Sequence, residues 1–458
     1  MTLEERVTGR RIGILGMARS GMAVARLAAR HGAKLLVSDS ADENRLAAQV
    51  KELSSTGIPF EVGGHTEALL QCDYLVLSPG VPLDLEIIKR ARDKGIPLFS
   101  EIEFASWFCQ GKIVAITGAN GKTTTTTLIG AMLAEARLPV RVAGNIGQPF
   151  AAVAEDLTPE SWAVLEISSF QLETIADFKP HIAAILNISP DHLDRHGTID
   201  AYREAKYRLT ENQDENDYLI LNRDDQTLST QPPKTNATTL YFTTGHNEEA
   251  ACVQNNQLCL TRNGVLVPVL PVDDISMFGK HNLENAAAAA LTAALCEVPN
   301  AAIAKVLRTF PGVEHRLEKV DTVAGITFVN DSKATNVESV AVALRAMSAP
   351  VWLILGGRDK GAGYAPIATA GQGKVRGIVA IGEAREKVFH ELGKSFPVEF
   401  ADSLPRAVRR CFELASPGDT VLLSPGCASF DMFDNFEHRG QVFKEAVKSL
   451  RNGRKKNE

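Results

Sequence analysis

The chain has 458 residues, enough for about three domains, and its 45% hydrophobic and 23% charged content is that of an ordinary soluble protein. Its formal net charge of −6 argues against general nucleic-acid binding, which normally comes with a basic surplus. No apolar run approaches membrane-spanning length, the charged first residues give no signal peptide, and the seven cysteines include no CxxC pair, so we expect a reduced cytoplasmic protein without membrane insertion.

Apolar strand-like runs alternate with helix-like segments along almost the whole chain, which indicates α/β domains with largely parallel sheets. We expect a Rossmann-like domain in residues 1–100, a P-loop ATPase-like domain in residues 101–312 and a small doubly wound domain in residues 313–458. Short strands and turns between residues 240 and 271 predict a β-rich insertion in the central domain. The run Phe310-Pro311-Gly312 marks the boundary before the third domain.

The first block opens with a predicted strand at residues 11–15 and the turn Gly16-Met17-Ala18-Arg19-Ser20-Gly21. Asp39 ends the next strand, about where dinucleotide-binding folds carry a ribose-binding acid. Ala18 stands where that fingerprint has its second glycine, and this counts against a standard NAD site because the backbone must approach the pyrophosphate there. This block alone therefore leaves two interpretations open, a nucleotide site and a glycine turn without a ligand.

The stretch Thr117-Gly118-Ala119-Asn120-Gly121-Lys122-Thr123-Thr124 says most about chemistry, because it follows a β-branched strand and precedes a helix-like segment. Its glycines let backbone N–H groups turn toward one point, and a helix N-terminus adds partial positive charge. Lys122 would reach the β- and γ-phosphates of a nucleotide, and the Thr123 hydroxyl would bind Mg²⁺. Ile116 occupies the place of the first glycine of the common motif, so the loop is a shortened P-loop. A Gly/Asn turn before an ordinary helix is the alternative.

Three residues after later strands are candidates for the same centre. Glu166 ends an apolar strand near the P-loop, where a carboxylate is well placed to hold Mg²⁺, although it could instead cap the following turn. His192 stands among several aspartates and could bind a metal or orient a phosphate, although a lone histidine is more often structural. Lys206 lies on a helix-like segment, and the pattern alone favours a solvated lysine.

In the third block, polar runs again follow predicted strands. Arg316 could reach across a domain boundary to stabilise a phosphate. The run from Asn330 to Asn336 is dense in polar residues, as binding loops are, but a capped helix start would also use such residues. The loops at 356–361 and 424–431 combine small residues with hydroxyl or cationic groups, which suits an anionic small substrate.

Together these motifs resemble those of the Mur ligases, a family of ATP-dependent enzymes that form amide bonds. The resemblance rests on the shortened P-loop, with Ala119 where threonine is more usual, and on the run Asp331-Ser332-Lys333-Ala334-Thr335-Asn336. It extends essentially end to end, and Ala18 is its clearest local departure, which leaves details of uridine-diphosphate binding open. Further matching runs are Ser78-Pro79-Gly80-Val81, Gly144-Asn145-Ile146-Gly147, Asp191-His192-Leu193-Asp194-Arg195 and Ser424 to Phe430.

Within the family, the run from Asp331 to Asn336 resembles the members that add D-glutamate, and the Asp-Asn-Pro-Arg run of the diaminopimelate-adding members does not occur in the sequence. The resemblance therefore implies ATP-dependent addition of D-glutamate to UDP-N-acetylmuramoyl-L-alanine through an acyl phosphate, in cytoplasmic peptidoglycan precursor synthesis. ATP and Mg²⁺ are the implied cofactors. We expect a monomer that binds no nucleic acid.

The resemblance also assigns roles to individual residues. Lys206 matches the lysine that the family carbamylates with CO₂, and the carbamate would join Thr123, Glu166 and His192 as a Mg²⁺ ligand; catalysis is assigned to Lys122, His192 and Lys206. The ATP-binding set is Gly118, Ala119, Asn120, Gly121, Lys122, Thr123, Thr124, Asn282, Asn285 and Arg316. The UDP-substrate set is Leu15, Gly16, Met17, Ala18, Asp39, Ser40, Ser78, Gly80 and Asn145. The amino-acid set is Thr335, Lys360, Ser424 and Phe430.

Three other functions stay open at this point. A related ligase for another amino acid, such as a folyl-polyglutamate type, is disfavoured by the UDP-type first block. An NAD-dependent oxidoreductase built on the first block is disfavoured by Ala18 and leaves the P-loop unused. A noncatalytic nucleotide-binding regulator would bind ATP without substrate-dependent phosphate release.

Overall fold

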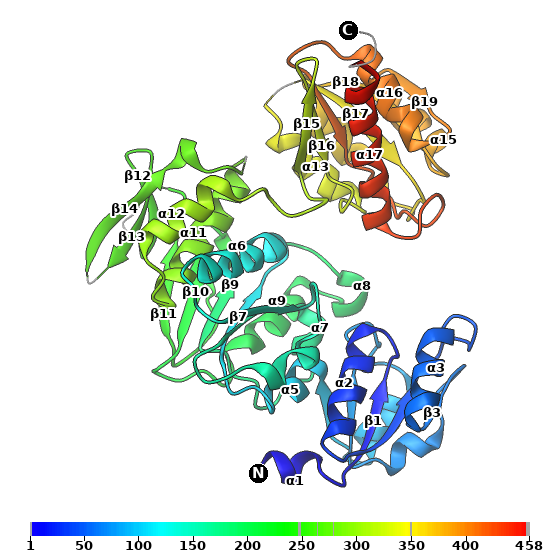
Figure 1. The fold of residues 1–458 in the computed structure, drawn as a ribbon, viewed down its shortest axis with the longest axis vertical. Coiled ribbons are helices and arrows are strands. Elements are labelled where there is room, and N and C mark those ends of the chain that lie inside the picture. Colours follow the sequence, from blue (N-terminus) through cyan, green and yellow to red (C-terminus); the bar gives the residue numbers. More distant parts are fainter. Residues whose placement is uncertain (1, 246–248, 263, 278, 349, 455–458) are drawn as a thin grey trace. The chain divides into compact units, whose positions relative to one another are not determined.

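The computed structural model describes residues 2–245, 249–262, 264–277, 279–348 and 350–454, and it divides into two compact units (Figure 1). The first unit comprises Met1–Ile275 and His281–Arg308, and the second comprises Ser276–Lys280 and Thr309–Glu458. Both units consist of sheets flanked by helices, which confirms the predicted α/β class. Among the described helices, none is long and apolar enough to cross a membrane.

The first unit begins with a five-stranded parallel sheet of order β3-β2-β1-β4-β5. Its strand order reverses between β1 and β4, with Leu15 opposite Leu77, and open α/β sheets bind their ligands at such a point. The strands are β1 (Arg11–Leu15), β2 (Lys34–Ser38), β3 (Phe60–Glu61), β4 (Tyr74–Leu77) and β5 (Leu98–Ser100). The helices are α1 (Leu3–Val7), α2 (Arg19–Arg30), α3 (Ala47–Thr56), η1 (Glu67–Gln71) and α4 (Glu86–Asp93).

The second sheet of this unit has nine strands in the order β14-β13-β12-β11-β10-β9-β6-β8-β7. The strands are β6 (Lys112–Thr117), β7 (Val140–Gly144), β8 (Trp162–Glu166), β9 (Ile182–Ile185), β10 (Tyr218–Asn222), β11 (Thr238–Phe242), β12 (Ala251–Gln254), β13 (Gln257–Arg262) and β14 (Val265–Pro271). Strand β11 pairs with β10, and β12 joins β11 where Phe242 lies opposite Ala251. The predicted β-rich segment is therefore an extension of the central sheet.

The helices around this second sheet are α5 (Glu101–Ser106), α6 (Lys122–Glu135), η2 (Phe150–Ala152), η3 (Ala154–Asp156), α7 (Ser169–Leu172), α8 (Leu193–His196), α9 (Ile199–Tyr207), η4 (Arg208–Thr210), α10 (Gln226–Thr230), η5 (Val272–Asp274), α11 (Lys280–Leu295) and α12 (Asn300–Thr309). Strands β8 and β9 are buried along their whole length, as expected of parallel strands that are covered on both faces. Strand β6 pairs with both, so Ile116 lies opposite Glu166 and Thr117 lies opposite Ile185. The loops after these three strands consequently open at one edge of the sheet.

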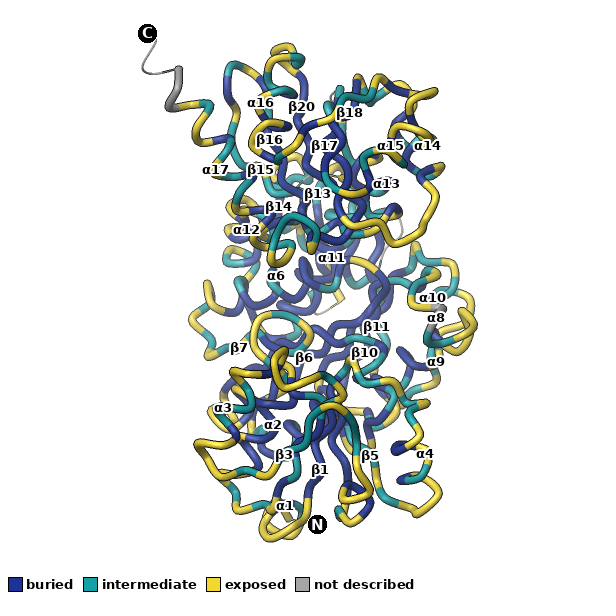
Figure 2. Tube along the Cα trace, turned by 90° about the vertical axis from the view of Figure 1, so that its right-hand side faces the viewer, coloured by how far each residue is buried: buried dark blue, intermediate teal, exposed yellow. Residues whose placement is uncertain are grey.

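The second unit contains a six-stranded sheet of order β15-β16-β20-β17-β18-β19, in which β15 is antiparallel to β16. The strands are β15 (Glu318–Val323), β16 (Ile326–Asn330), β17 (Val351–Gly356), β18 (Val375–Ile381), β19 (Val398–Phe400) and β20 (Thr420–Leu423). The helices are α13 (Val337–Ala346), α14 (Ala365–Gly371), α15 (Arg385–Leu392), α16 (Leu404–Leu414) and α17 (Phe436–Arg454). Two apolar clusters line this sheet, and Figure 2 shows the buried strands between more exposed helices and loops. Residues 451–454 of the basic C-terminal segment continue α17.

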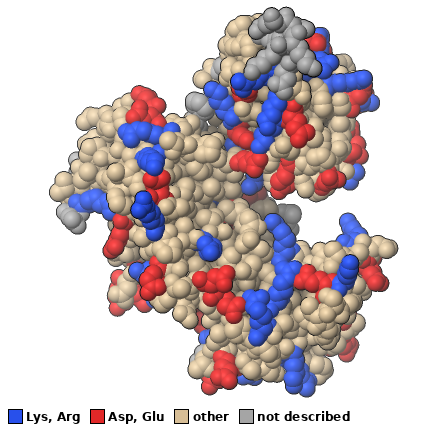
Figure 3. Space-filling model, in the orientation of Figure 1, with Lys and Arg blue, Asp and Glu red and all other residues tan. Residues whose placement is uncertain are grey.

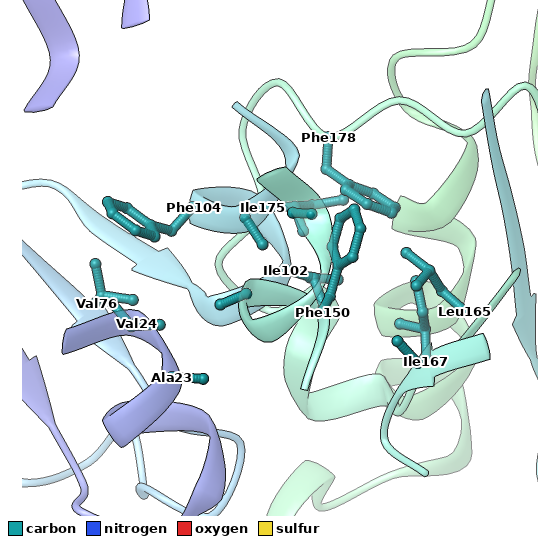
Figure 4. Close-up of a cluster of buried hydrophobic side chains, with 14 of the residues drawn as sticks. Ala23, Val24, Val76, Ile102, Phe104, Phe150, Leu165, Ile167, Ile175 and Phe178 are labelled. Carbon is teal, nitrogen blue, oxygen red and sulfur yellow. The ribbon is translucent and has the colours of Figure 1, made fainter. Parts of the chain in front are cut away.

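One continuous core joins the two sheets of the first unit. Figure 4 shows it: Ala23 and Val24 of α2 and Val76 of β4 belong to the same buried cluster as Phe150 and Leu165. Helix α5 follows β5 directly and adds Ile102 and Phe104 to this cluster. Because apolar burial is the main stabilising contribution in a core, residues of both sheets form one compact unit.

Two buried glutamates of α5 strengthen this junction. The Glu103 carboxylate accepts hydrogen bonds from the N–H groups of Ala176, Asp177 and Phe178 and from Trp107 Nε1. Glu101 Oε1 accepts a 2.7 Å hydrogen bond from the Ala151 N–H. Burial raises the pKa of Glu101 to about 7, since a charge is costly away from water.

The raised pKa of Glu101 predicts a pH-dependent stability. Between pH 4.5 and pH 7 the folded chain keeps a proton on Glu101 that the unfolded chain has lost, so wild-type stability falls as pH rises through this range. The glutamine side chain of Glu101→Gln is neutral at every pH. We therefore expect the melting temperature of the variant, relative to that of the wild type, to be about 5 °C higher at pH 8 than at pH 5. Differential scanning calorimetry measures the difference, with Glu215→Gln on an exposed loop as the control. A difference that stays constant with pH would contradict the prediction.

On the face that Figure 3 shows, basic and acidic side chains of the described residues occur over both units. This distribution accords with the small negative net charge.

Candidate active site

The loop from Gly118 to Gly121 connects β6 to α6 as the P-loop pattern predicts. Gly118 and Gly121 have φ values of 152° and 84°, which favour glycine. A Cβ atom on Gly121 would lie 2.2 Å from Asn285 Oδ1, so the close approach of α11 also requires glycine there. Gly121 is the N-cap residue of α6, and no cap side chain accepts a hydrogen bond from the first-turn N–H groups of this helix. Such a helix start is suited to an anion.

Asparagines from the loop after β9 and from helix α11 lie beside this turn. Asn187, just after β9, accepts from the N–H groups of Ala119 (3.1 Å, backbone oxygen) and Asn120 (2.8 Å, Oδ1). Its Nδ2 donates back to Asn120 O at 3.1 Å. Asn285 Nδ2 donates to Asn282 Oδ1, so the structure brings these two predicted residues to the P-loop. Sequence reasoning gave Asn187 no role; its place directly after a strand next to the P-loop strand was the available signal.

Two lysine amines meet at the beginning of the loop. Lys122 Nζ donates to the carbonyls of Gly118 and Ala119, both at 2.9 Å. Lys206 Nζ, from α9, donates to the same Gly118 carbonyl at 2.9 Å and to Thr117 Oγ1 at 3.3 Å. Lys206 is 1% exposed, and burial, followed by the charge of Lys122, lowers its pKa well below the ordinary value. The lowered pKa favours the neutral form of the amine, which is the nucleophilic form.

The Glu166 carboxylate lies beside the P-loop at the end of β8. It is 2% exposed; its Oε2 accepts from Thr123 Oγ1 at 2.7 Å and its Oε1 accepts from Asn145 Nδ2 at 2.8 Å. The negative charges of Asp191 and Glu166 act to raise the pKa of Lys206, against the larger lowering by burial. Hydroxyl and carboxylate oxygens are the donors that Mg²⁺ prefers, so Thr123 and Glu166 fit this ion.

His192 contacts Phe170 and Asp191. Its backbone has φ 51°, its ring centroid lies 4.8 Å from that of Phe170, and its Nε2 lies 3.6 Å from Asp191 Oδ2. Among the residues that the structure describes, no group of three or more His, Cys, Asp or Glu side chains is arranged to hold a metal ion. Thr123, Glu166 and Lys206 thus gather at the P-loop, whereas His192 lies in an exposed turn.

The predicted UDP residues surround the switch point of the first sheet. Ser78 N donates to Leu15 O at 2.9 Å, and Ser78 Oγ donates to Gly16 O at 3.2 Å. The Asp39 carboxylate accepts from Met17 N at 2.7 Å and from Ala41 N at 2.9 Å. Three more predicted residues are exposed on the adjoining loops: Ala18, Ser40 and Gly80.

Asn145 connects this region to the P-loop edge. A Cβ atom on Gly144 would lie 2.3 Å from Glu166 O, so glycine lets the chain pass close to β8, and Asn145 N donates to that same oxygen at 2.9 Å. At the other end of the run, Arg19 Nη1 donates to Gly147 O at 3.1 Å. The loop from Gly144 to Gly147 thus contacts both predicted sites of the first unit.

In the second unit, the loops after β16 and β20 are fastened together. Asp331 Oδ2 accepts from Ser424 Oγ at 2.7 Å, and burial raises the pKa of Asp331 to about 7. Arg439 of α17 is completely buried and donates to Ser332 Oγ at 2.9 Å, Ser332 O at 2.8 Å and Cys427 O at 3.1 Å. Sequence reasoning missed Arg439, because an arginine in a polar helix carries no sign of burial.

The other predicted residues of this unit lie at the same strand ends. Thr335 is half-buried on the loop after β16, and Phe430, after β20, is 64% exposed. Lys360 is exposed on the loop after β17, where Arg358 exchanges backbone hydrogen bonds with Ala428. Arg316 is half-buried, and its charge lowers the pKa of Asp331 against the effect of burial.

Three family models match consecutive parts of the chain: "Mur ligase MurD-like, N-terminal domain" at residues 10–100, "Mur ligase middle domain" at 116–293 and "Mur ligase, glutamate ligase domain" at 315–427. The UDP-N-acetylmuramoylalanine–D-glutamate ligase of Solibacter usitatus is 43% identical over 447 residues, 97% of this chain and 99% of that protein. The chain belongs to the Mur ligase family. The Acidobacterium capsulatum enzyme of the same name is 42% identical over 443 residues, 96% of each chain.

Solved Mur ligase structures share the fold at low sequence identity. The MurF ligase from Thermotoga maritima in complex with ADP has a TM-score of 0.60 at 15% identity, covering 98% of this chain and 97% of that one. The MurC ligase from the same organism has a TM-score of 0.59 at 18% identity, covering 96% and 99%. The predicted family and fold are confirmed, and as a Mur ligase this protein is an ATP-dependent ligase. An NAD-dependent oxidoreductase is thereby excluded.

Replacement of Lys122 tests the P-loop of this Mur ligase. We expect Lys122→Ala to lower kcat/KM for ATP by about 100-fold or more, because a cation next to transferring phosphate is lost. The fold should persist, since Lys122 Nζ donates to carbonyls of the loop itself. Phosphate release and thermal melting measure the two effects, with exposed Lys94→Ala as the control. Near-normal turnover by Lys122→Ala would disprove the P-loop assignment.

Proposed function

We propose that this protein joins D-glutamate to UDP-N-acetylmuramoyl-L-alanine with ATP, in the synthesis of peptidoglycan precursors. The observation that carries the proposal is the 42–43% identity, over nearly the whole chain, to proteins named UDP-N-acetylmuramoylalanine–D-glutamate ligase in Acidobacterium capsulatum and Solibacter usitatus. The match of residues 10–100 to the MurD-like N-terminal domain supports the same precursor class. As the resemblance implies, the enzyme acts as a monomer in the cytoplasm.

Each domain has one ligand in this proposal. Residues 1–100 bind the uridine-diphosphate end of the precursor, residues 101–312 bind ATP and Mg²⁺, and residues 313–458 bind D-glutamate. The turn at Gly16 and the loop at Ser78 support the first role, because they meet at the switch point of a parallel sheet. The P-loop supports the second. The fastened loops that carry Ser424 and Thr335 support the third.

The reaction that follows has two steps. A carboxylate oxygen of the L-alanine residue attacks the γ-phosphorus of ATP, ADP leaves, and an acyl phosphate forms. The D-glutamate amine then attacks the acyl carbon, inorganic phosphate leaves, and the amine loses its proton. Two anions approach each other in the first step, so the repulsion must be offset by fixed positive groups. Lys122 and the first N–H groups of α6 provide them, with Asn282, Asn285 and Arg316 as further ATP contacts.

Magnesium and a modified lysine belong to the same proposal. Thr123, Glu166, His192 and Lys206 as a carbamate would hold Mg²⁺, which when bound neutralises phosphate charge. The amine of Lys206 supports its modification: its lowered pKa favours the neutral form, whose nitrogen can attack CO₂ and then release a proton to give a carbamate anion. The oxygen donors of Thr123 and Glu166 support the ion.

Substrate-dependent phosphate release tests the function. We expect the protein with ATP, Mg²⁺ and UDP-N-acetylmuramoyl-L-alanine to release phosphate when D-glutamate is added, and not when L-glutamate or L-alanine replaces it. Mass spectrometry of the nucleotide product should show the mass of one added glutamate. Release with L-alanine or L-glutamate would indicate a related ligase with another amino acid, and release without any amino acid would indicate an ATPase.

Replacement of Lys206 tests its modification. We expect Lys206→Ala to lose about 100-fold or more in kcat and to regain part of it in millimolar acetate or propionate, because a free carboxylate can take the place of the carbamate. Exposed Lys305→Ala, which loses a surface ion pair with Glu135, should gain nothing from these acids. Full activity of Lys206→Ala without added acid would remove the carbamate from the mechanism.

A further inference from the structure

Arg195 bridges the two sheets of the first unit, and the two-step reaction has so far given it no role. It lies in α8, three residues after His192. Its Nη1 donates to Pro79 O at 3.3 Å, which is in the loop after β4 of the first sheet. Its Nε and Nη2 bind the two carboxylate oxygens of Glu173, which follows α7 beside the second sheet. One guanidinium therefore contacts segments that follow strands of both sheets.

The ring of Phe170 holds this guanidinium from another side. The Arg195 guanidinium carbon lies 4.2 Å from the ring centroid, within the range of a cation–π contact. The rings of His192 and His196 lie 4.8 Å and 5.6 Å from the same centroid. Arg195 and His192 consequently pack against the same ring, so a movement of either side chain changes its contact with Phe170.

The ion pair is partly shielded from water and geometrically fixed. The side chains of Arg195 and Glu173 are 18% and 15% exposed, and the planar guanidinium meets both carboxylate oxygens. A two-point pair of this kind fixes orientation as well as position. Glu173 is held in turn by its backbone, because Arg208 Nη1 donates to Glu173 O at 2.6 Å. The ion pair is thus fixed to the segment after α7, beside the second sheet, and the Nη1 group of Arg195 reaches Pro79 O.

Pro79 lies between two residues of the proposed precursor site, Ser78 and Gly80. Ser78 binds Gly16 through its hydroxyl, so a shift of Pro79 also shifts the contact between this loop and the glycine turn. His192, at the other end, belongs to the proposed metal site. Arg195 thus joins the loop at Pro79 to the turn at His192, because its side chain donates to Pro79 O and its backbone N–H donates to His192 O at 3.1 Å.

We propose that Arg195 is a positioning residue, which holds the precursor loop at Ser78–Gly80 in register with the reaction edge that carries His192. The inference rests on the proposed function. It requires Arg195 to act on the precursor and on turnover, and not on ATP or D-glutamate binding. A residue that serves stability alone would affect all three substrates together, or none.

The experiment compares Arg195→Gln, Arg195→Lys and Arg203→Gln with the wild type. Arg203 is the matched control, since it also forms ion pairs and lies over a ring, but its partners are Asp200, Glu204 and Gln231. We expect Arg195→Gln to raise the KM for UDP-N-acetylmuramoyl-L-alanine about tenfold and to lower kcat, with the KM values for ATP and D-glutamate within about twofold of the wild type. We expect the precursor KM of Arg195→Lys to lie between those of the wild type and Arg195→Gln. A lysine ammonium keeps the charge but cannot bind Glu173 and Pro79 at once as the planar guanidinium does.

A double variant separates positioning from stability. Arg195→Gln leaves the mostly buried Glu173 carboxylate with His196 Nδ1, 3.6 Å from its Oε1, as its ion-pair partner. The loss of the two-point pair with Arg195 lowers the melting temperature by itself. Adding Glu173→Gln removes the carboxylate charge, so the melting temperature should recover while the raised precursor KM remains. Recovery of the precursor KM together with the melting temperature would overturn the proposal, as would an unchanged precursor KM in Arg195→Gln.

Amide hydrogen exchange gives a readout that does not depend on the reaction. We expect faster exchange at the amides of Ser78, Gly80 and Val81 in Arg195→Gln and in the double variant, and wild-type exchange in Arg203→Gln. Unchanged exchange in this loop would overturn the positioning role even if turnover fell. If the wild type itself releases no phosphate with D-glutamate, the proposed function fails, and the exchange result with calorimetric titration of the precursor still decides the role of Arg195.

Discussion

The carbonyl of Gly118 accepts hydrogen bonds from two lysine amines, and the chemistry of the first unit depends on this contact. Two ammonium groups at one oxygen repel each other, and Lys206 is also buried, so the shared contact favours a neutral Lys206 amine. The contact needs the unusual backbone of Gly118, where φ is 152° and a Cβ atom would lie 3.1 Å from Leu186 Cβ. The backbone turn at Gly118 therefore positions both the P-loop and the Lys206 amine.

The sheet supplies the remaining groups because its central strands are parallel. Ile116 lies opposite Glu166 and Thr117 lies opposite Ile185, so the loops after β6, β8 and β9 leave the sheet side by side. The hydroxyl of Thr123 consequently donates to the Glu166 carboxylate. The core beneath is continuous with that of the first sheet, and the Glu103 carboxylate fastens the junction through three backbone N–H groups. A rigid junction of this kind lets a single side chain such as Arg195 transmit the position of one loop to another.

Local sequence patterns predicted the elements and loops that depend on residues adjacent along the chain. They did not predict the burial of side chains that depends on tertiary packing. The strand before the P-loop and the loop itself were predictable, since an apolar run and the order Gly-Lys-Thr are local signals. Lys206 was not: its neighbours Arg203 and Glu204 indicate a solvated helix, and only a family resemblance singled it out, whereas in the fold it is 1% exposed. The pairing of β11 with β10 and β12 was not predicted, because a strand pattern does not specify which strands pair.

The departure at Ala18 is explained by where the constraints of the glycine turn lie. A Cβ atom on Gly21 would lie 1.8 Å from Gly16 O, and Gly16 has φ 96°, so these two glycines make the turn tight. Ala18 is exposed and adopts extended backbone before α2, a conformation open to any residue. Asp39 binds the N–H groups of Met17 and Ala41 and so fixes the loops after β1 and β2 relative to each other. The first sheet thus has a tight glycine turn without the second glycine that an NAD site needs, and the Asp39 carboxylate holds together the loops to which the proposed function assigns the precursor.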